Sequence, residues 1–294
     1  MERAKGILYA ALSSSTFGLA PLFTLLLLGL GYSSFEVLSY RWGVASVFLC
    51  ALALLAGRSF RLSWPELRTV FFLSLFRAAT SLSLVIAYQH IASGVASTIH
   101  FMYPLAVALA MMCFFREKGS VWVFAAIGMS IVGAVLLSLG NVDFTRGNTT
   151  LGMVSAAVSV VSYGGYIVGV RKSRAVGIDS TVLTCYVMGL GALYFIAGGL
   201  VTGGIRIETD GTAWLCILGV ALPATAVSNM TLVQAIKRIG PTLTSVFGAL
   251  EPLTAVVIGV AVFGEPFTVQ GAAGILLIVA AVTIVILHSG RRKA

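Results

Sequence analysis

The sequence predicts an all-α, polytopic membrane protein with ten transmembrane helices, arranged as a 5+5 inverted repeat around a central cavity. Of its 294 residues, 59% are apolar and only 10% are charged, and the mean hydropathy is +1.01. A soluble domain carries about 25% charged residues, and a soluble surface this apolar would aggregate. The composition therefore excludes a secreted domain, a cytosolic enzyme and a disordered chain.

Ten apolar runs, separated by short polar breaks, are the predicted spans. A spanning helix needs roughly 20 apolar residues. Each run must be helical, because an unclosed strand would leave backbone groups unpaired in hydrocarbon, and the runs lack the two-residue alternation of a barrel strand. The first run is longer than the ~7–15 apolar residues of a signal peptide, so we expect it to remain uncleaved as the first span. The predicted spans are residues 6–30, 34–57, 67–88, 92–115, 121–139, 149–170, 180–203, 212–233, 240–263 and 267–288.

The Lys and Arg residues fall almost entirely on one side of these spans. Of the 19, only Arg146 and Arg206 would lie on the far side, and Arg41 and Arg77 lie inside spans. Positively charged loops stay in the cytoplasm, so both termini are predicted to be cytoplasmic. A nucleic-acid site would gather the positive charge on one domain face instead, so the net charge of +9 indicates topology and no nucleic-acid partner is expected.

The sequence predicts neither a cofactor nor a metal site. Its four cysteines lie inside apolar runs without metal-site spacing. The sequence has no P-loop, no HExxH and no GxSxG motif, so we expect no ATP drive of its own, no catalytic residue and no enzyme activity. The cysteines are Cys50, Cys113, Cys185 and Cys216.

The two halves of the sequence resemble each other. The octapeptide GILYAALS at 6–13 is similar to GMVSAAVS at 152–159, with an offset of 146. Phe17-Gly18 matches Tyr163-Gly164 at the same offset. Later in each half the offset is 148, as in the matches of Pro104-Leu105 with Pro252-Leu253 and of Phe115-x-Glu117 with Phe263-x-Glu265.

This repeat predicts two structural units, residues 1–140 and 141–294. Each unit would contain five spans. Because five is odd, the second unit enters the membrane from the opposite side, which defines an inverted repeat. Such a repeat provides two similar conformations that open to opposite sides. We therefore expect transport by alternating access through a central cavity between the units.

Each half contains a set of recognisable motifs. They are Ala96-Ser97 through Pro104, Phe115-Arg116-Glu117-Lys118 and Gly128…Gly133 in the first half, and Leu250-Glu251-Pro252, Phe263-Gly264-Glu265 and Gly271…Gly274 in the second. These motifs resemble those of EamA-type transporters, which belong to the drug/metabolite transporter superfamily. The resemblance covers nearly the whole chain, and Arg41 also fits its pattern. Tyr103 occupies the place of Glu251 in the first half.

Within this family the chain looks most similar to the YddG-type aromatic amino-acid exporters. The resemblance implies a multi-pass protein of the bacterial inner membrane, and a monomer is expected. It also implies efflux of small molecules, here aromatic and other neutral amino acids.

Charged side chains at membrane depth are the first candidates for the site, because each costs ~2.5–3.5 kcal/mol at the bilayer centre. Arg77 lies ten residues into its predicted span, about 15 Å deep, whereas Arg41 is shallow enough to snorkel. A guanidinium binds a carboxylate in bidentate fashion, so either arginine could bind substrate. A buried Arg–Glu pair is the structural alternative. With Glu251 as the single acid, one positive charge would stay unmatched and suit an anionic ligand group.

Helical spacing places polar and aromatic side chains on the same faces as these charges. Glu251, ahead of Pro252, could bind an ammonium group, carry a proton or pair with arginine. His100 could bind substrate or serve only in packing. The full set of candidate substrate-binding residues is Arg41, Arg77, Tyr88, His100, Tyr103, Tyr163, Tyr166, Asn229, Phe247 and Glu251.

Three functions stay open at this point. The first is export of amino acids by a secondary carrier. The second is export of other metabolites or drugs of the same superfamily. The third is a membrane enzyme or receptor that transports nothing.

Overall fold

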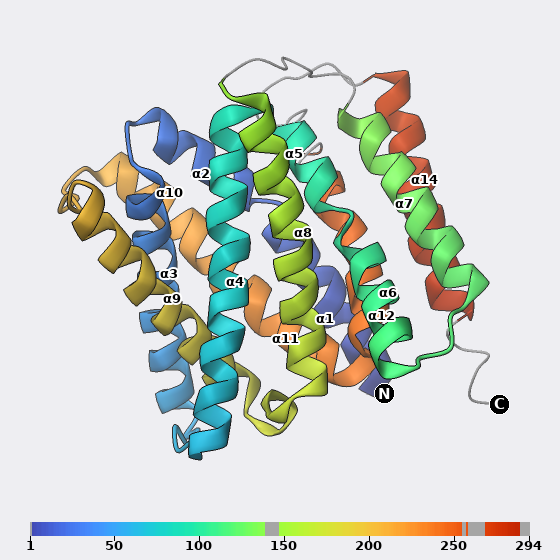
Figure 1. Ribbon diagram of the computed structural model, residues 1–294, viewed down its shortest axis with the longest axis horizontal. Helices are drawn as coiled ribbons and strands as arrows, with labels where there is room; N and C mark the ends of the chain where they lie inside the picture. Colours follow the sequence, from blue (N-terminus) through green and yellow to red (C-terminus); the bar gives the residue numbers. More distant parts are fainter. Residues whose placement is uncertain (1, 139–146, 255–256, 258–267, 289–294) are drawn as a thin grey trace.

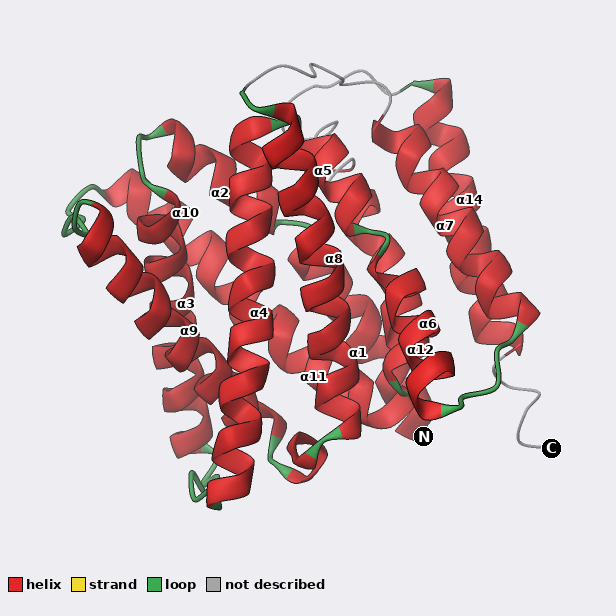
Figure 2. Cartoon of the chain, viewed as in Figure 1, coloured by secondary structure: helices red, strands yellow, loops and turns green. Residues whose placement is uncertain are grey.

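The computed structural model describes residues 2–138, 147–254, 257 and 268–288 (Figure 1). This part of the chain is built from helices and short loops, without a strand (Figure 2). The elements are α1 (Glu2–Phe17), α2 (Ala20–Gly29), α3 (Ser34–Leu55), α4 (Trp64–His90), α5 (Ser93–His100), α6 (Tyr103–Phe115), α7 (Val121–Ser138), α8 (Thr149–Lys172), η1 (Arg174–Gly177), α9 (Ser180–Thr202), α10 (Gly211–Ala221), η2 (Leu222–Val227), α11 (Ser228–Ile239), α12 (Pro241–Val246), η3 (Phe247–Ala249) and α14 (Val269–His288).

Seven helical segments are long and apolar enough to cross a membrane. They are Glu2–Gly29, Ser34–Leu55, Trp64–His90, Val95–Phe115, Thr149–Lys172, Ser180–Thr202 and Gly211–Ile239, and two shorter apolar helices cover Val121–Leu136 and Val269–Ile284. These nine segments overlap nine of the predicted spans. The remaining span, 240–263, begins with α12 and η3, and most of its second half lies outside the described residues, as does the motif at 263–265.

Several spans expected to be continuous are interrupted near their middle, which corrects the sequence-based expectation. The first is divided into α1 and α2 just ahead of Pro21, and the fourth into α5 and α6 just ahead of Pro104. The eighth passes through η2, a π-helical turn that contains Pro223. Proline lacks a backbone donor and clashes with the preceding turn, so each of these residues loosens its helix. Half-helices at membrane depth are the usual surroundings of a transport site.

Polar side chains fix where the helices begin. Ser33 and Glu36 form a capping box at α3, with the Glu36 N–H donating to Ser33 Oγ at 3.2 Å and the Ser33 N–H donating to Glu36 Oε2 at 2.8 Å. Asn148 accepts from the Leu151 N–H at 3.0 Å at the start of α8. Asp179 caps α9 in the same way. Each cap satisfies amide groups that the first helical turn cannot pair internally.

The most extensive helix contacts join the first half of the chain to the second. Helix α3 packs on α9, α4 on α8, α1 on α11 and α7 on α14, and α6 makes smaller contacts with α12. The α7–α14 pair stands at one edge of the molecule (Figure 1).

Close helix approaches in this arrangement depend on small residues. A β-carbon built on Gly6 of α1 would lie 2.5 Å from Ile239 Cγ2 of α11, and one built on Gly152 of α8 would lie 2.6 Å from Ile91 Cγ2 at the end of α4. Small residues at such crossings are typical of membrane helices, because they let the backbones approach each other.

The connections expected to be basic lie at one end of the bundle. The N-terminus and the α3–α4, α6–α7 and α8–α9 connections meet there, at the lower edge of Figure 1. Arg58 pairs with Asp179 at 3.6 Å and Arg238 with Glu2 at 3.1 Å at this end. We call it the basic end.

Candidate functional site

Four aromatic rings surround the guanidinium of Arg77, which is buried in the middle of α4 with 1% of the residue exposed. The guanidinium carbon lies 5.1 Å from the ring centroid of Tyr163, 5.4 Å from Phe17, 5.9 Å from Trp42 and 6.0 Å from Tyr166. The rings come from α1, α3 and α8, so both halves contribute. Cation–π attraction of about 0.5–2 kcal/mol per good contact partly replaces the lost hydration of the cation. We call these four rings the ring cluster.

Arg77 also has two polar partners. Its Nε donates to Asn229 Oδ1 at 2.8 Å, and Nη1 donates to Ser81 Oγ at 3.3 Å. The Asn229 amide is itself fixed, because its Nδ2 donates to the Thr225 carbonyl at 2.8 Å. Arg77 and Asn229, which were separate candidates 152 residues apart in sequence, are therefore brought together by α4 and α11.

Arg41 lies beside the ring cluster and does not snorkel, which corrects that expectation. The residue is 4% exposed, its Nε donates to Thr225 Oγ1 at 2.6 Å, and its guanidinium carbon lies 5.7 Å from the Phe17 ring centroid. Thr225 belongs to the π-helical turn η2 and donates in turn to the Val220 carbonyl at 2.7 Å. In this wide turn, the Thr225 hydroxyl accepts a hydrogen bond from Arg41, and the Thr225 carbonyl accepts one from Asn229. π-Helical turns of this kind are frequent at functional sites.

Within the described part of the chain, neither buried arginine forms an ion pair. The structural Arg–Glu pair that was the alternative is therefore not seen among these residues. Glu251, the acid expected to provide it, instead accepts a hydrogen bond from the Tyr103 hydroxyl at 3.1 Å.

His100, Tyr103 and Tyr163 form a second group next to the ring cluster. The Tyr103 and Tyr163 centroids are 4.6 Å apart, and the His100 ring lies 5.4 Å from Tyr103 and 5.3 Å from Tyr163. His100 Nδ1 lies 2.8 Å from Ser159 Oγ. Because Ser159 Oγ already donates to the Ala156 carbonyl at 2.5 Å, it accepts from His100, which places the ring proton on Nδ1.

Four buried polar atoms around these two groups have no hydrogen-bond partner among the described residues. They are Arg41 Nη2, Trp42 Nε1, His100 Nε2 and the Tyr166 hydroxyl. A buried polar group without a partner costs ~1–3 kcal/mol, and native proteins contain few of them. These four atoms are therefore candidates for hydrogen bonds with a polar ligand.

Two further predicted residues have their closest packing partners elsewhere. Tyr88 packs with Leu84 and Ile91 and its hydroxyl is 3.4 Å from Ser97 Oγ, while it also interacts electrostatically with Arg41 and Glu251. Phe247 packs with residues of α1 and α11, such as Ala10. Sequence reasoning also missed three residues of the site. They are Phe17, Trp42 and Thr225, and only Phe17 carried a usable signal, since it matches Tyr163 in the repeat.

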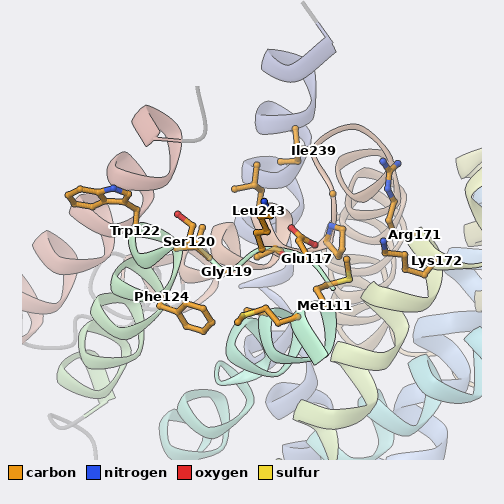
Figure 3. A pocket seen from close by; sticks show the side chains of 17 residues that line it. Met111, Glu117, Gly119, Ser120, Trp122, Phe124, Arg171, Lys172, Ile239 and Leu243 are labelled. Atoms are coloured by element: carbon orange, nitrogen blue, oxygen red, sulfur yellow. The ribbon is translucent and has the colours of Figure 1, made fainter. Parts of the chain in front are cut away.

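A cleft of about 330 Å³ opens at the basic end, between the ends of α6 and α8 and the starts of α7 and α12. Figure 3 shows Arg171 and Lys172 on one side of it and Trp122 and Phe124 on the other. Met111 of α6 also lines the cleft. None of the predicted site residues lines it, although the structure describes all of them. In the described residues no group of three potential metal ligands is present.

Comparison with known proteins identifies the family. The sequence profile of the EamA-like transporter family matches residues 4–139 and again residues 150–287. The uncharacterized transporter YojE of Bacillus subtilis (strain 168) is 27% identical over 283 residues, which cover 91% of this chain and 88% of YojE. An uncharacterized transporter of Archaeoglobus fulgidus is 24% identical over 217 residues, 74% of this chain and 76% of that protein.

A solved crystal structure has the same fold. It superposes on 100% of this chain and 99% of its own chain with a TM-score of 0.78 at 20% identity. The two profile matches together span most of the sequence, and the named relatives are transporters rather than enzymes. The chain therefore belongs to the EamA-like transporter family, as a multi-pass helical membrane protein.

Proposed function

We propose that this transporter exports amino acids, aromatic and other neutral ones among them, by alternating access between two inverted five-helix halves. The observation that carries the proposal is that residues at equal positions in the two halves touch each other beside Arg77. Phe17 stacks on its counterpart Tyr163, with centroids 6.3 Å apart and planes 15° apart. Tyr103 donates to its counterpart Glu251.

Contacts between counterparts support a symmetry axis in the proposed repeat. Two residues related by a two-fold axis can touch only if both lie next to that axis. The axis of the proposed repeat therefore passes through the ring cluster. A transport site on this axis changes least when one half moves relative to the other, which is what alternating access around a fixed site requires.

The pairing of the helices supports the same symmetry. Exchanging the halves turns the α1–α11 contact into the α8–α4 contact. It leaves the α3–α9 and α7–α14 contacts unchanged. All these pairings are present, as a two-fold relation demands.

Individual contacts are repeated as well. Gly6 meets Ile239, and their counterparts Gly152 and Ile91 meet in the same way. A β-carbon on Gly18 would approach Thr254 Cβ at 2.7 Å, and one on the counterpart Gly164 would approach Ala106 Cβ at 3.6 Å. The offsets are the 146 and 148 residues that the sequence matches predict.

The chemistry of the cluster suits an amino acid. The carboxylate would bind Arg77 and the unpaired nitrogen of Arg41, because guanidinium groups bind carboxylates strongly. An aromatic or aliphatic side chain would lie against Phe17 and Tyr163. We propose that the solute reaches this site from the cytoplasm through the cleft at the basic end. Met111, on its wall, is eight residues along α6 from Tyr103, or about 12 Å.

Flux through purified protein tests the function. Proteoliposomes loaded with radiolabelled phenylalanine, threonine or methionine are expected to release them faster than protein-free vesicles. Arg77→Gln should lower the release at least tenfold, because it removes the buried cation, whereas Arg58→Gln at the exposed basic end should not. Release no faster than from protein-free vesicles contradicts the proposal.

The proposed location is the bacterial inner membrane, with both termini in the cytoplasm and a monomer as the working unit. The positive charge of the basic end supports this orientation. In a variant without the four native cysteines, Ser120→Cys should react with an impermeant maleimide only in opened cells. Thr209→Cys, in the α9–α10 connection at the opposite end, should react in intact cells. The reverse pattern contradicts the orientation.

A further inference from the structure

We propose that the central site selects its substrate by net negative charge, so that a carboxylate without an ammonium group binds more tightly than the zwitterionic amino acid of the same shape. The inference rests on the proposed function only for the location of the site. It adds small organic anions with an apolar body to the substrate class and ranks their affinity above that of neutral amino acids.

The charges of the site do not balance in the residues that the structure describes. Arg41 and Arg77 bring two positive charges, and both residues are at most 4% exposed. Glu251, which interacts electrostatically with Arg77, accepts a hydrogen bond from Tyr103 through its Oε1. Other acids are engaged at helix ends, as in the pair of Glu36 with Arg206 at 3.2 Å. Even with Glu251 ionised, the site keeps one net positive charge.

A zwitterion cannot remove that excess, because its own two charges cancel. A monoanion does remove it, and the site then becomes neutral in a region where hydration cannot compensate a charge. The electrostatic balance therefore favours the anion.

The unpaired atoms point the same way. Within the described structure, Arg41 Nη2 and Trp42 Nε1 are left without partners, and both atoms are donors only. The Tyr166 hydroxyl, also unpaired there, can donate as well. These atoms need acceptors, which the two oxygens of a carboxylate supply and an ammonium group does not.

The ring cluster offers little to an ammonium group. Its four ring faces already attract the guanidinium of Arg77, and a second cation there would meet that charge directly. With the proton on Nδ1, His100 Nε2 is a neutral acceptor. It can receive a hydroxyl or N–H group of the ligand but cannot offset a positive charge.

Three ligands with the same phenyl ring and two-carbon chain test the proposal. They are 3-phenylpropionate, L-phenylalanine and 2-phenylethylamine, which carry net charges of about −1, 0 and +1 at neutral pH. Equilibrium binding to the full-length protein in detergent is expected to be about tenfold tighter for 3-phenylpropionate than for phenylalanine, and undetectable for the amine. Equal or tighter binding of phenylalanine overturns the proposal, as does binding of the amine or failure of all three to bind.

Variants add a second readout. Arg41→Gln should reduce the preference for the anion over phenylalanine to about twofold or less, whereas Arg58→Gln should keep it. The ratio of the two affinities in the unaltered protein is itself the test of the proposal. The proposal can therefore be tested even if Arg41→Gln does not fold. Anion preference without flux in proteoliposomes would contradict the proposed function alone. Phenylalanine flux without anion preference would contradict this inference alone.

Discussion

Phe17 and Tyr163 stack on each other at the centre of the protein while occupying the same position in the two halves of its sequence. Both rings also lie within 5.4 Å of the Arg77 guanidinium, measured from its central carbon to the ring centroids. A single cation is therefore held by two rings that match in the sequence repeat, whereas both buried arginines, Arg41 and Arg77, belong to the first half. The two halves thus share a sequence pattern but contribute different side chains to the site.

Exchanging these two residues should preserve activity. In the double variant Phe17→Tyr/Tyr163→Phe the ring faces around Arg77 stay the same and only the hydroxyl moves to the other half. We expect amino-acid release within about threefold of the unaltered protein. Phe17→Ala should lower it at least tenfold, because it removes a cation–π partner of both arginines. An exchange variant as inactive as Phe17→Ala would mean that the hydroxyl, not the pair of rings, is what the site needs.

The Tyr103–Glu251 contact gives the second prediction. Glu251→Gln should impair export without loss of folded protein, because the amide keeps an acceptor for the Tyr103 hydroxyl but removes the charge. Glu66→Gln is the matched control, since Glu66 caps the start of α4 far from the site. Export rates and the yield of monodisperse protein measure the two effects. Unchanged export in Glu251→Gln would place this residue outside the mechanism.

The sequence predicts the spans well because length and apolarity are local properties. The interruptions of those spans were not predicted, although Pro104 and Pro223 are visible in the sequence. A proline bends or divides a membrane helix only as far as neighbouring helices can satisfy the freed carbonyls. That depends on packing that the sequence does not display.

For the site, buried charge was an informative signal and helical spacing was a weak one. Arg77 and Asn229 were predicted separately and are in contact. Tyr88 was assigned through its spacing from Arg77, and its role in the site stays a prediction. Trp42 was missed because an aromatic residue in an apolar span resembles its surroundings. Thr225 was missed because its role depends on the π-helical turn.

Thr225 provides the third prediction. Thr225→Val keeps the shape of the side chain but removes the oxygen that accepts from Arg41 Nε. Leaving this buried donor without its acceptor should destabilise the protein by about 1–3 kcal/mol and lower export several-fold. The control is Thr231→Val, since Thr231 is equally buried in the next helix and its hydroxyl bonds only to helix carbonyls among the described residues. Equal effects of the two variants, in melting temperature and in export, would show that Thr225 acts only in local packing.

The repeated glycine contacts give the last prediction. Gly6→Ala and Gly152→Ala should destabilise the protein to a similar degree, about 1–3 kcal/mol each, because each new methyl group would meet an isoleucine at 2.5–2.6 Å. Gly43→Ala should be neutral, since no described atom lies within 4 Å of its β-carbon position. Thermal unfolding in detergent measures all three. If the interfaces are truly equivalent, Ile239→Ala should rescue Gly6→Ala but not Gly152→Ala. Loss of stability in only one of the two glycine variants would contradict equivalence, because a two-fold axis imposes the same crossing on both helix pairs.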